Sequence, residues 1–329
     1  MHTFLRGRDF ITCQEWSVEE LELALQLAAE FKRDWAVGRP HPLLPYKTFF
    51  MIFFDNSTRT RNSFEAAMTQ LGGHAHDLTP DRLQISHGEN AKDTAKVLSR
   101  YGHGIGIRHT VYGEGNAYLR EVALHAEIPV INMQCDIYHP CQALADLMTI
   151  RERFGTNTRG LKMAVSWTSA PNYVRPISVP QSLILLMPRF GIDVVLAHPP
   201  EFALMPEIVA QARKNAEQAG TRFEITDRME DAFEDADVVY PKSWGPLTYT
   251  RDKAEGIELI KKYPDWRCDS RMMSLARSRA IYMHPLPADR RFEVTDEVID
   301  GSQSVVYDQA ENRLHVQKAI LALTMGGRP

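Results

Sequence analysis

Hydroxyl and guanidinium groups gather in the segment STRTR (57–61), directly after the apolar run KTFFMIFFD (47–55). The run has the length of a buried strand, and the residues after it begin a helical pattern with an apolar stripe. Backbone N–H groups, the positive end of a helix dipole, hydroxyls and guanidinium groups converge at such a helix start and favour a bound phosphate. The alternative is a serine N-cap beside surface arginines. The coincidence of strand, hydroxyls and arginines favours the phosphate site, where one of Arg59 and Arg61 binds the anion and the other is structural.

Two further polar groups are expected at strand ends, where open α/β sheets bind their ligands. Arg108 follows the apolar part of the predicted strand 104–109, and HPCQ (139–142) follows another predicted strand. Proline suits the first position of a helix, so HPCQ would open one. His139 and Gln142 could then donate hydrogen bonds to a carbonyl oxygen, although His139 could equally serve only as a helix cap.

The second half of the chain has two comparable segments, PKSWG (241–245) and HPLP (284–287), each after a predicted strand. The prolines on both sides of Leu286 would fix the backbone and withhold N–H groups, which leaves carbonyl groups to face a ligand. An ordinary rigid loop is the alternative. Arg290 and Arg291 follow closely and could simply be solvated charges.

Other phosphate and metal motifs are absent from the sequence. The segment GIGIRH has His109 where the dinucleotide-binding fingerprint requires a third glycine, and no G-x-x-x-x-G-K-[ST] segment occurs. Neither a dehydrogenase nor a nucleotide hydrolase is therefore indicated. The four cysteines form no C-x-x-C pair, which argues against a zinc knuckle and a disulfide framework.

The composition is that of a globular protein. With 329 residues, 44% of them hydrophobic and 24% charged, the chain suits two domains of about 150 residues each. The net charge of −4 indicates neither nucleic acid nor an anionic membrane as a partner. No apolar run approaches the roughly 20 residues that span a bilayer, and the polar start of the chain lacks a signal-peptide core. A cytoplasmic location is therefore expected.

Strand and helix patterns alternate along the chain, which predicts parallel sheets with helices on both faces. In the first half, we expect helices at 18–37, 57–73, 91–101, 116–126 and 140–154, and strands at 47–55, 104–109 and 128–134. In the second half, we expect strands at 162–167, 193–199, 222–226, 237–244 and 280–284, and helices near 178–190, 205–219 and 229–236. The fold class is therefore α/β, with two doubly wound, Rossmann-like parallel-sheet domains. They comprise residues 1–155 and 156–310, and a long last helix at 311–325 could cross back so that 311–329 joins the first domain.

The motifs STRTR, a strand-end arginine, H-P-x-Q and H-x-L-P together resemble the aspartate/ornithine carbamoyltransferase superfamily in order and spacing. The similarity extends to QISHGEN (84–90), HPCQALADL (139–147) and ENRLHVQKA (311–319). It implies an enzyme that moves the carbamoyl group of carbamoyl phosphate to an amine and releases phosphate, without a metal or an organic cofactor. It further implies a first domain that binds carbamoyl phosphate, a second domain that binds an amino-acid-like amine, and a homotrimer with shared active sites.

The same resemblance implies roles for individual residues. The carbamoyl phosphate site would consist of Ser57, Thr58, Arg59, Thr60, Gln84, Arg108, His139, Gln142 and Leu286. The segment 57–60 would hold the phosphate, Arg108, His139 and Gln142 the carbonyl group and its leaving side, and the Leu286 carbonyl the carbamoyl NH₂. Gln84 resembles the family residue that reaches into a neighbouring subunit's site. During attack by the amine, Thr60, Arg108 and His139 would stabilise the oxyanion, and one such donor is typically worth about 2.7–4 kcal/mol.

The proline-rich segment 167–180, with K-S-W-G, resembles the knotted branch of the superfamily, which includes the N-acetylornithine and N-succinylornithine carbamoyltransferases. A trefoil knot is therefore expected in the second domain between Trp167 and about Trp244, although proteins rarely thread their chains.

The chain also departs from both kinds of ornithine-type enzyme. The ornithine enzymes carry S-M-G where this chain has SWG (243–245), and a cysteine where it has Pro285. The acetylornithine enzymes carry a lysine at the position aligned with Glu293 and basic residues at 288–289. They also have a tryptophan-bearing loop near residue 80, where Gln84 is closer to the ornithine pattern.

The second-substrate site would consist of Trp167, Lys242, Ser243, Trp244, Pro285, Arg290 and Glu293. Trp244 would add an apolar wall with one N–H donor, and Lys242 a cation suited to a carboxylate or an acyl oxygen. Glu293 would counter Lys242 or accept a hydrogen bond from the substrate. These features favour an acylated or otherwise altered amine over free ornithine. In the alternative, Trp244 packs in the core and Glu293 points to solvent.

Three other functions stay open at this point: transfer to ornithine, transfer to aspartate, and a catalytically idle paralogue that binds a metabolite as a scaffold or regulator. The intact STRTR, Arg108 and HPCQ set argues against the idle paralogue, because a scaffold has no need of groups that polarise a carbonyl. Transfer to aspartate is less favoured, because the loop 81–90 contains no lysine and Lys92 falls on the next predicted helix.

Overall fold

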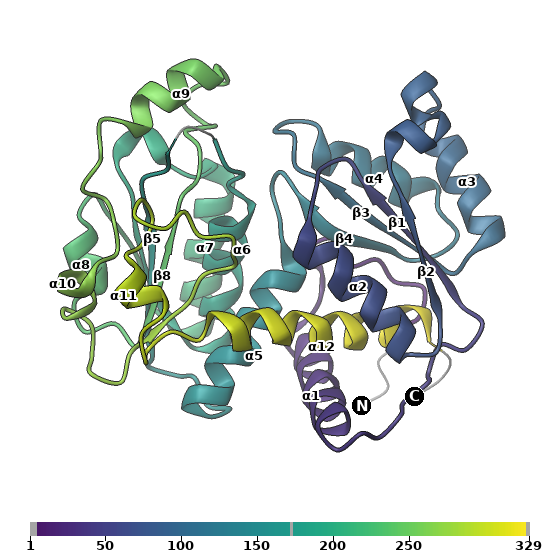
Figure 1. The fold of residues 1–329 in the computed structure, drawn as a ribbon, viewed down its shortest axis with the longest axis horizontal. Coiled ribbons are helices and arrows are strands. Elements are labelled where there is room, and N and C mark those ends of the chain that lie inside the picture. Colours follow the sequence, from purple (N-terminus) through teal and green to yellow (C-terminus); the bar gives the residue numbers. More distant parts are fainter. Residues whose placement is uncertain (1–4, 172–173, 327–329) are drawn as a thin grey trace. The chain divides into compact units, whose positions relative to one another are not determined.

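The computed structural model describes residues 5–171 and 174–326. The chain divides into two compact units, Met1–Met148 with Glu311–Pro329 and Thr149–Ala310, termed the first and the second unit below. The division lies inside helix α5 (Pro140–Phe154), a few residues before the boundary expected near Gly155. Helix α12 (Val306–Met325) carries the end of the chain back into the first unit (Figure 1).

The first unit is built on a parallel sheet of four strands in the order β2-β1-β3-β4. The strands are β1 (Thr48–Phe53), β2 (His74–Leu78), β3 (Gly104–His109) and β4 (Val130–Cys135). Strand β2 was not predicted from the sequence, because HAHDL contains no apolar run. The strand lies at the edge of the sheet, where it pairs with β1 alone and only Leu78 is buried.

Helices cover both faces of this first sheet. The ring of Phe49 on β1 stacks on Phe64 of α2, with ring centroids 5.7 Å apart. Ile52 and Ile107, on the opposite face, share a buried cluster with residues of α3 and α4. The helices of the first unit are α1 (Val18–Ala36), α2 (Thr58–Gln70), α3 (Ala91–Tyr101), α4 (Gly115–His125) and the adjoining parts of α5 and α12.

The second unit is built on a parallel sheet of five strands in the order β7-β6-β5-β8-β9. The strands are β5 (Lys162–Trp167), β6 (Asp193–Ala197), β7 (Phe223–Thr226), β8 (Val238–Lys242) and β9 (Ile281–Tyr282). Residues of α8, α10 and α11 pack with Ala164 and Val239 on one face, and α6 and α7 lie on the other (Figure 1). The helices are α6 (Ser178–Leu186), α7 (Pro206–Ala219), α8 (Met229–Phe233), α9 (Lys253–Ile260), α10 (Ser270–Met273) and α11 (Asp296–Ile299).

Each sheet has one point at which the strand order reverses direction. In the first unit it lies between β1 and β3, and in the second unit between β5 and β8. Ligands of open parallel sheets bind beyond the carboxyl ends of the strands at this point, because the connections on its two sides leave a crevice there. The two reversal points therefore indicate where each unit would hold a ligand.

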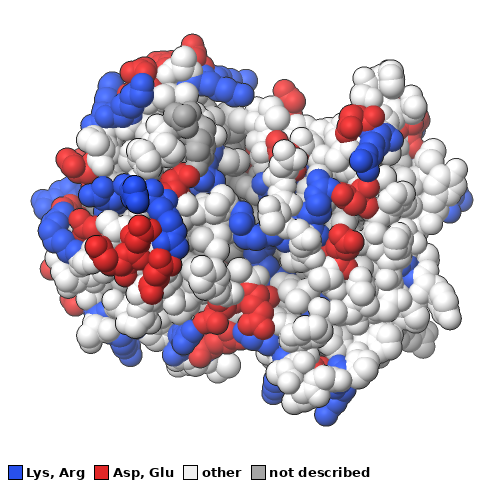
Figure 2. Space-filling model, in the orientation of Figure 1, with Lys and Arg blue, Asp and Glu red and all other residues white. Residues whose placement is uncertain are grey.

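The surface shows acidic and basic side chains mixed over the face in Figure 2, without a broad basic area on that face. Within the described residues, no helix is long and apolar enough to cross a membrane.

Candidate active site

Residues that the sequence analysis selected in the first unit gather at the reversal point of its sheet. The residues after β1 open α2, and Arg108 lies on β3 in register with Phe53, the last residue of β1. His139 directly precedes α5, and its pKa responds to the charge of Arg108. The structure thus brings together three segments that were each expected at a strand end.

The start of α2 is organised by Ser57, whose Oγ accepts the backbone N–H of Thr60 at 3.1 Å. Ser57 is therefore an N-cap, as the simpler alternative proposed, and this is compatible with an anion at the same helix end. Thr58 is exposed and Arg59 is partly buried. Arg61 is the structural arginine: it forms an ion pair with Asp77, and its guanidinium lies 4.1 Å from the centre of the Phe53 ring.

Arg313 is a site residue that the sequence analysis missed. It lies on α12, is 3% exposed, and donates from Nη2 to Thr60 Oγ1 at 2.7 Å. It is separated from Thr60 by 253 positions in the chain, so no local pattern links the two residues. The only available signal was an arginine inside the ENRLHVQKA segment, where a buried cation requires a reason.

The group is electrostatically positive. Burial and the nearby Arg313 lower the pKa of Arg108 to about 10, while Asp55 opposes the shift and Arg59 adds to it. Asp55 is the one carboxylate among these influences, and its Oδ2 already accepts hydrogen bonds from the backbone and the hydroxyl of Thr110 at 2.7 and 2.8 Å. Arg59, Arg108 and Arg313 therefore bring three guanidinium groups close together, which favours the binding of a dianion.

His139 is the neutral member of the group. Burial, with the charges of Arg313 and Arg108, lowers its pKa well below the ordinary value. A neutral imidazole has one N–H donor, so His139 can donate to a carbonyl oxygen without first taking up a proton.

Gln142 is oriented differently from the expectation that it donates to a ligand. Its Nε2 donates to Asp146 Oδ1 at 2.8 Å, and both side chains are buried. Its Oε1 is buried and accepts no hydrogen bond from the described residues. The amide oxygen of Gln142 is therefore the atom that could accept a hydrogen bond from a ligand.

Gln84 stands apart from this group in the described structure. It begins the short 3₁₀ helix Gln84–His87 and is exposed. Its carbonyl oxygen accepts the N–H of Glu89 at 3.1 Å, which closes the turn. The role in a neighbouring subunit's site stays a prediction.

In the second unit, the reversal point places Trp167 and Lys242 opposite each other, as register partners at the ends of β5 and β8. Lys242 Nζ donates to Glu293 Oε1 at 2.9 Å, and to the carbonyl and hydroxyl oxygens of Ser243 at 3.0 and 3.2 Å. An ammonium group has three N–H donors, so these contacts use all of them. The expectation that Lys242 offers a cation to the substrate is therefore not supported by its geometry.

Glu293 is fully buried, which corrects the alternative that it points to solvent. Its Oε1 also accepts the backbone N–H of Ser243 at 2.6 Å, and its Oε2 accepts that of Asp289 at 2.7 Å. Burial alone would raise the pKa of Glu293, but Lys242 and His284 hold it well below the ordinary value. Burial lowers the pKa of Lys242 to about 8 despite this partner. The pair connects the end of β8 to the loop before Glu293.

The HPLP segment is held in a fixed conformation. His284 is buried, and its Nδ1 accepts the backbone N–H of Leu286 at 2.9 Å. Leu286 has a positive φ of 51° and precedes a cis peptide bond to Pro287. Pro285 is buried. The Leu286 carbonyl as acceptor for a carbamoyl NH₂ stays a prediction.

The remaining second-substrate residues do not line an evident binding surface. Trp167 and Trp244 are 0% and 1% exposed, and their indole N–H groups donate to the carbonyls of Trp244 and Phe202, both at 2.8 Å. The alternative in which Trp244 packs in the core therefore fits better. Arg290 lies at the surface, where it pairs with Asp296 and Asp300.

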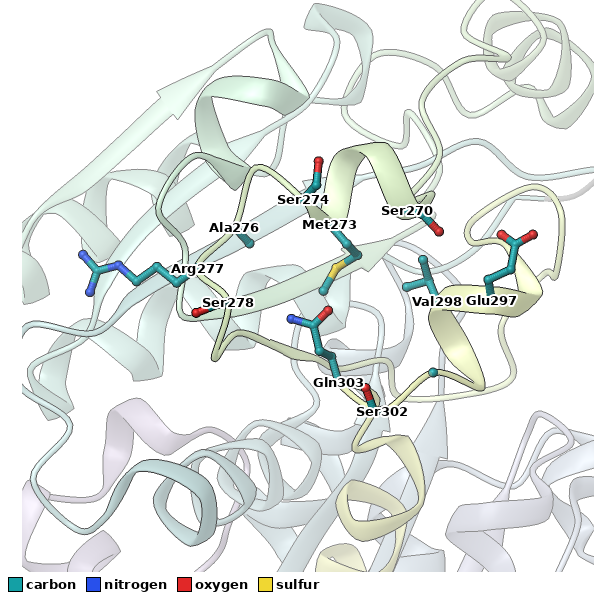
Figure 3. Close-up of a pocket in the computed structure, with 11 residues that line it drawn as sticks. Ser270, Met273, Ser274, Ala276, Arg277, Ser278, Glu297, Val298, Ser302 and Gln303 are labelled. Atoms are coloured by element: carbon teal, nitrogen blue, oxygen red, sulfur yellow. The ribbon is translucent and has the colours of Figure 1, made fainter.

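A separate cavity of about 460 Å³ lies in the second unit beside α10 and α11 (Figure 3). Its lining includes the hydroxyls of Ser270, Ser274, Ser278 and Ser302, and the side chains of Arg277 and Gln303. None of the residues predicted from the sequence lines it. In the described part of the chain, no three His, Cys, Asp or Glu side chains are arranged to hold a metal ion.

Comparisons with known proteins agree on one family. Residues 8–152 match the aspartate/ornithine carbamoyltransferase carbamoyl-P binding domain, and residues 176–324 match the corresponding Asp/Orn binding domain. The chain is 37% identical over 362 aligned residues to the YgeW protein of Escherichia coli (strain K12), covering 99% of this chain and 91% of that protein. It is 43% identical over 323 residues to the anabolic ornithine carbamoyltransferase of Pyrococcus furiosus, covering 98% of both.

Two solved structures have the same fold. The ornithine carbamoyltransferase of Pyrococcus furiosus superposes with a TM-score of 0.90 at 41% identity, covering 99% of both chains. An acetylornithine transcarbamylase complexed with acetylcitrulline superposes with a TM-score of 0.90 at 33% identity, covering 97% of this chain and 100% of that one. The chain is therefore a carbamoyltransferase, and it belongs to the aspartate/ornithine carbamoyltransferase superfamily.

Proposed function

We propose that the protein binds carbamoyl phosphate in the first unit and transfers its carbamoyl group to the amine of an amino-acid-like acceptor, with release of phosphate. The observation that carries this proposal is the meeting of Arg59, Arg108, Arg313 and a neutral His139 at the reversal point of the first sheet. Such a group suits a phosphate joined to a carbonyl, because it combines cations with a neutral N–H donor.

The phosphate would lie at the start of α2, where backbone N–H groups and Arg59 face it. When the amine attacks the carbonyl carbon, negative charge develops on the carbonyl oxygen. Arg108, His139 and the Thr60 hydroxyl would stabilise that charge; Thr60 Oγ1 accepts from Arg313, which leaves its own proton to donate. The tetrahedral intermediate then expels phosphate, which takes the amine's proton. The mechanism requires no covalent enzyme intermediate and no cofactor.

The acceptor that we favour has an amine to be carbamoylated and an α-amino group that is acylated, otherwise modified or missing. The support comes from the carboxylates beside Ser243 and Leu286. Both oxygens of Glu293 accept hydrogen bonds within the chain, and Asp289 pairs with Arg175 at 2.9 Å. Among the described residues of these loops, no carboxylate is thus left to compensate a free α-ammonium, and an uncompensated buried charge is costly.

Free ornithine is the second candidate acceptor. It is favoured by the 43% identity to the Pyrococcus furiosus ornithine enzyme over nearly the whole chain. The acetylornithine neighbour is less similar in sequence, at 33%, but has the same TM-score of 0.90.

The test is steady-state phosphate release with carbamoyl phosphate and a panel of ornithine, N-acetylornithine, N-succinylornithine, putrescine and aspartate. We expect release with at least one α-modified amine and a lower kcat/KM for ornithine. A tenfold or greater preference for ornithine, about 1.4 kcal/mol in transition-state binding, would overturn the acceptor proposal alone. Tight binding of carbamoyl phosphate without turnover on a broad amine panel would favour the idle paralogue instead.

Two structural expectations belong to the same proposal. A homotrimer with shared sites would give exposed Gln84 a partner. A knot in the second unit is the other expectation. Residues of the segment 167–175 contact later parts of the chain: the N–H of Ser169 donates to Trp266 O, and the N–H of Gly245 to Arg175 O. Asn172 and Tyr173, in the proline-rich segment, lie outside the described residues.

A further inference from the structure

A buried pair on α5 is not explained by the residue roles described so far. Gln142 and Asp146 are 1% and 0% exposed, lie one helical turn apart, and are joined by the 2.8 Å hydrogen bond from Gln142 Nε2 to Asp146 Oδ1. A completely buried acidic side chain requires a specific reason, because burial disfavours its charge.

The pair determines which way the amide faces. A carboxylate only accepts hydrogen bonds, so the amide must turn its NH₂ group toward Asp146 and its oxygen away from it. That oxygen is buried and has no hydrogen-bond donor among the described residues. Since buried acceptors are nearly always paired, an unpaired acceptor beside the anion site marks the place of a ligand N–H.

We propose that Asp146 is a positioning residue, which holds the Gln142 amide so that its oxygen accepts a hydrogen bond from the carbamoyl NH₂ group. This inference rests on the proposed function, because it presumes that carbamoyl phosphate occupies the site. Without Asp146, the amide could turn over and present its NH₂ group. Discrimination between a carbamoyl group and an acyl group therefore depends on a residue that does not touch the substrate.

Two stable ligands separate this role from general binding. Phosphonoacetamide and acetonylphosphonate share a phosphonate and a carbonyl group, and differ in carrying NH₂ or CH₃ on the carbonyl carbon. The wild-type protein should bind the amide about tenfold or more tightly than the ketone, because the ketone leaves the Gln142 oxygen unpaired. Calorimetric titration of both ligands gives the ratio of the two dissociation constants.

Three variants test the role of Asp146 through this ratio. Asp146→Leu keeps the branched shape of the side chain and removes the fixed acceptor, so the preference should fall to within about threefold. The double variant Gln142→Glu with Asp146→Asn exchanges the two functional groups and keeps the net charge. Its relocated carboxylate can accept from both the relocated amide and the ligand NH₂, so the preference should return. Ser57→Ala is the control at the phosphate end, where both ligands should weaken by the same factor and the ratio should persist.

Each outcome bears on one claim. If the wild-type protein binds neither ligand, the proposed function fails. If the wild type prefers the amide and a folded Asp146→Leu keeps that preference, the positioning role is wrong. Equal loss of both ligands in Asp146→Leu would likewise indicate a purely structural role. If Asp146→Leu does not fold, the exchanged variant decides, since a folded protein without amide preference would overturn the inference.

Discussion

At the scale of single residues, the first unit separates two arginines that sit two positions apart in the sequence. Arg61 is committed to Asp77 and the Phe53 ring, whereas Arg59 contributes to the positive group around Arg108. One arginine of each kind was expected from the sequence, without an assignment of the two roles. The contacts of Arg61 with β1 and β2 give it a structural role and favour Arg59 as the arginine that binds the anion.

This assignment predicts opposite phenotypes for two matched substitutions. Arg59→Ala should weaken binding of phosphonoacetamide by ten- to a hundredfold and leave thermal stability nearly unchanged, because it removes a charge-assisted contact to the anion. Arg61→Ala should lower the melting temperature and change the affinity by less than threefold. Calorimetric titration and thermal melting of both variants provide the measurements. Equal affinities for wild type and Arg59→Ala would remove Arg59 from the phosphate site.

At the scale of elements, the buried Lys242–Glu293 pair fixes the end of β8 against the loop that carries HPLP. The two residues are 51 positions apart, and Glu293 binds the backbone of both Ser243 and Asp289. The pair is thus better understood as a connection between two loops than as two substrate contacts. Any effect on the acceptor would come through the positions of these loops.

A double-mutant cycle tests this connection. Glu293→Gln should destabilise the protein by about 3–5 kcal/mol, because it leaves the Lys242 ammonium buried without its counter-charge. Adding Lys242→Met should recover much of that loss, since the uncompensated charge is then gone. Urea denaturation of the wild type, both single variants and the double variant gives the coupling energy. Strictly additive effects would mean that the two side chains do not stabilise one another.

Much of the fold could be predicted from the sequence, because buried strands and amphipathic helices leave strong local patterns. The strands 104–109 and 162–167 have the predicted bounds. Strand β2 was missed because an edge strand with polar residues has no apolar run. Helix α9 was missed because it is short and weakly patterned.

The candidate site was predictable where a motif is local and unpredictable where its meaning depends on distant partners. The Ser57 cap and the start of α5 follow from a few adjacent residues. Lys242 looked like a substrate cation because nothing nearby in the sequence reveals Glu293 as its partner. Arg313 was overlooked for the same reason, since its contact to Thr60 forms only when the last helix packs in the first unit.

At the scale of the whole molecule, both units hold histidines in surroundings that disfavour their protonation. Burial is the largest cause in every case. The histidines with a lowered pKa are His41, His103, His109, His139, His198, His284 and His315. In the unfolded chain these rings would titrate near their ordinary pKa of about 6.5. Below that pH the unfolded state therefore binds more protons than the folded state, and stability must fall as the pH falls.

The resulting prediction concerns the window from pH 7.5 down to pH 5, above the range where most carboxylates take up protons. The folded-state pKa values are depressed, so the stability from neutral histidines is fully present above about pH 6.5 and is lost below it. His315, fully buried on α12 with its pKa lowered to about 3, should stay neutral across the window. His315→Gln should therefore reduce the pH dependence of the free energy of unfolding by up to about 1.4 kcal/mol per pH unit, the contribution of one proton. The matched control is His87→Gln, the same substitution at an exposed histidine. Urea denaturation at four pH values would measure the slopes, and a wild-type stability that stays flat from pH 7.5 to pH 5 would contradict the account of the buried histidines.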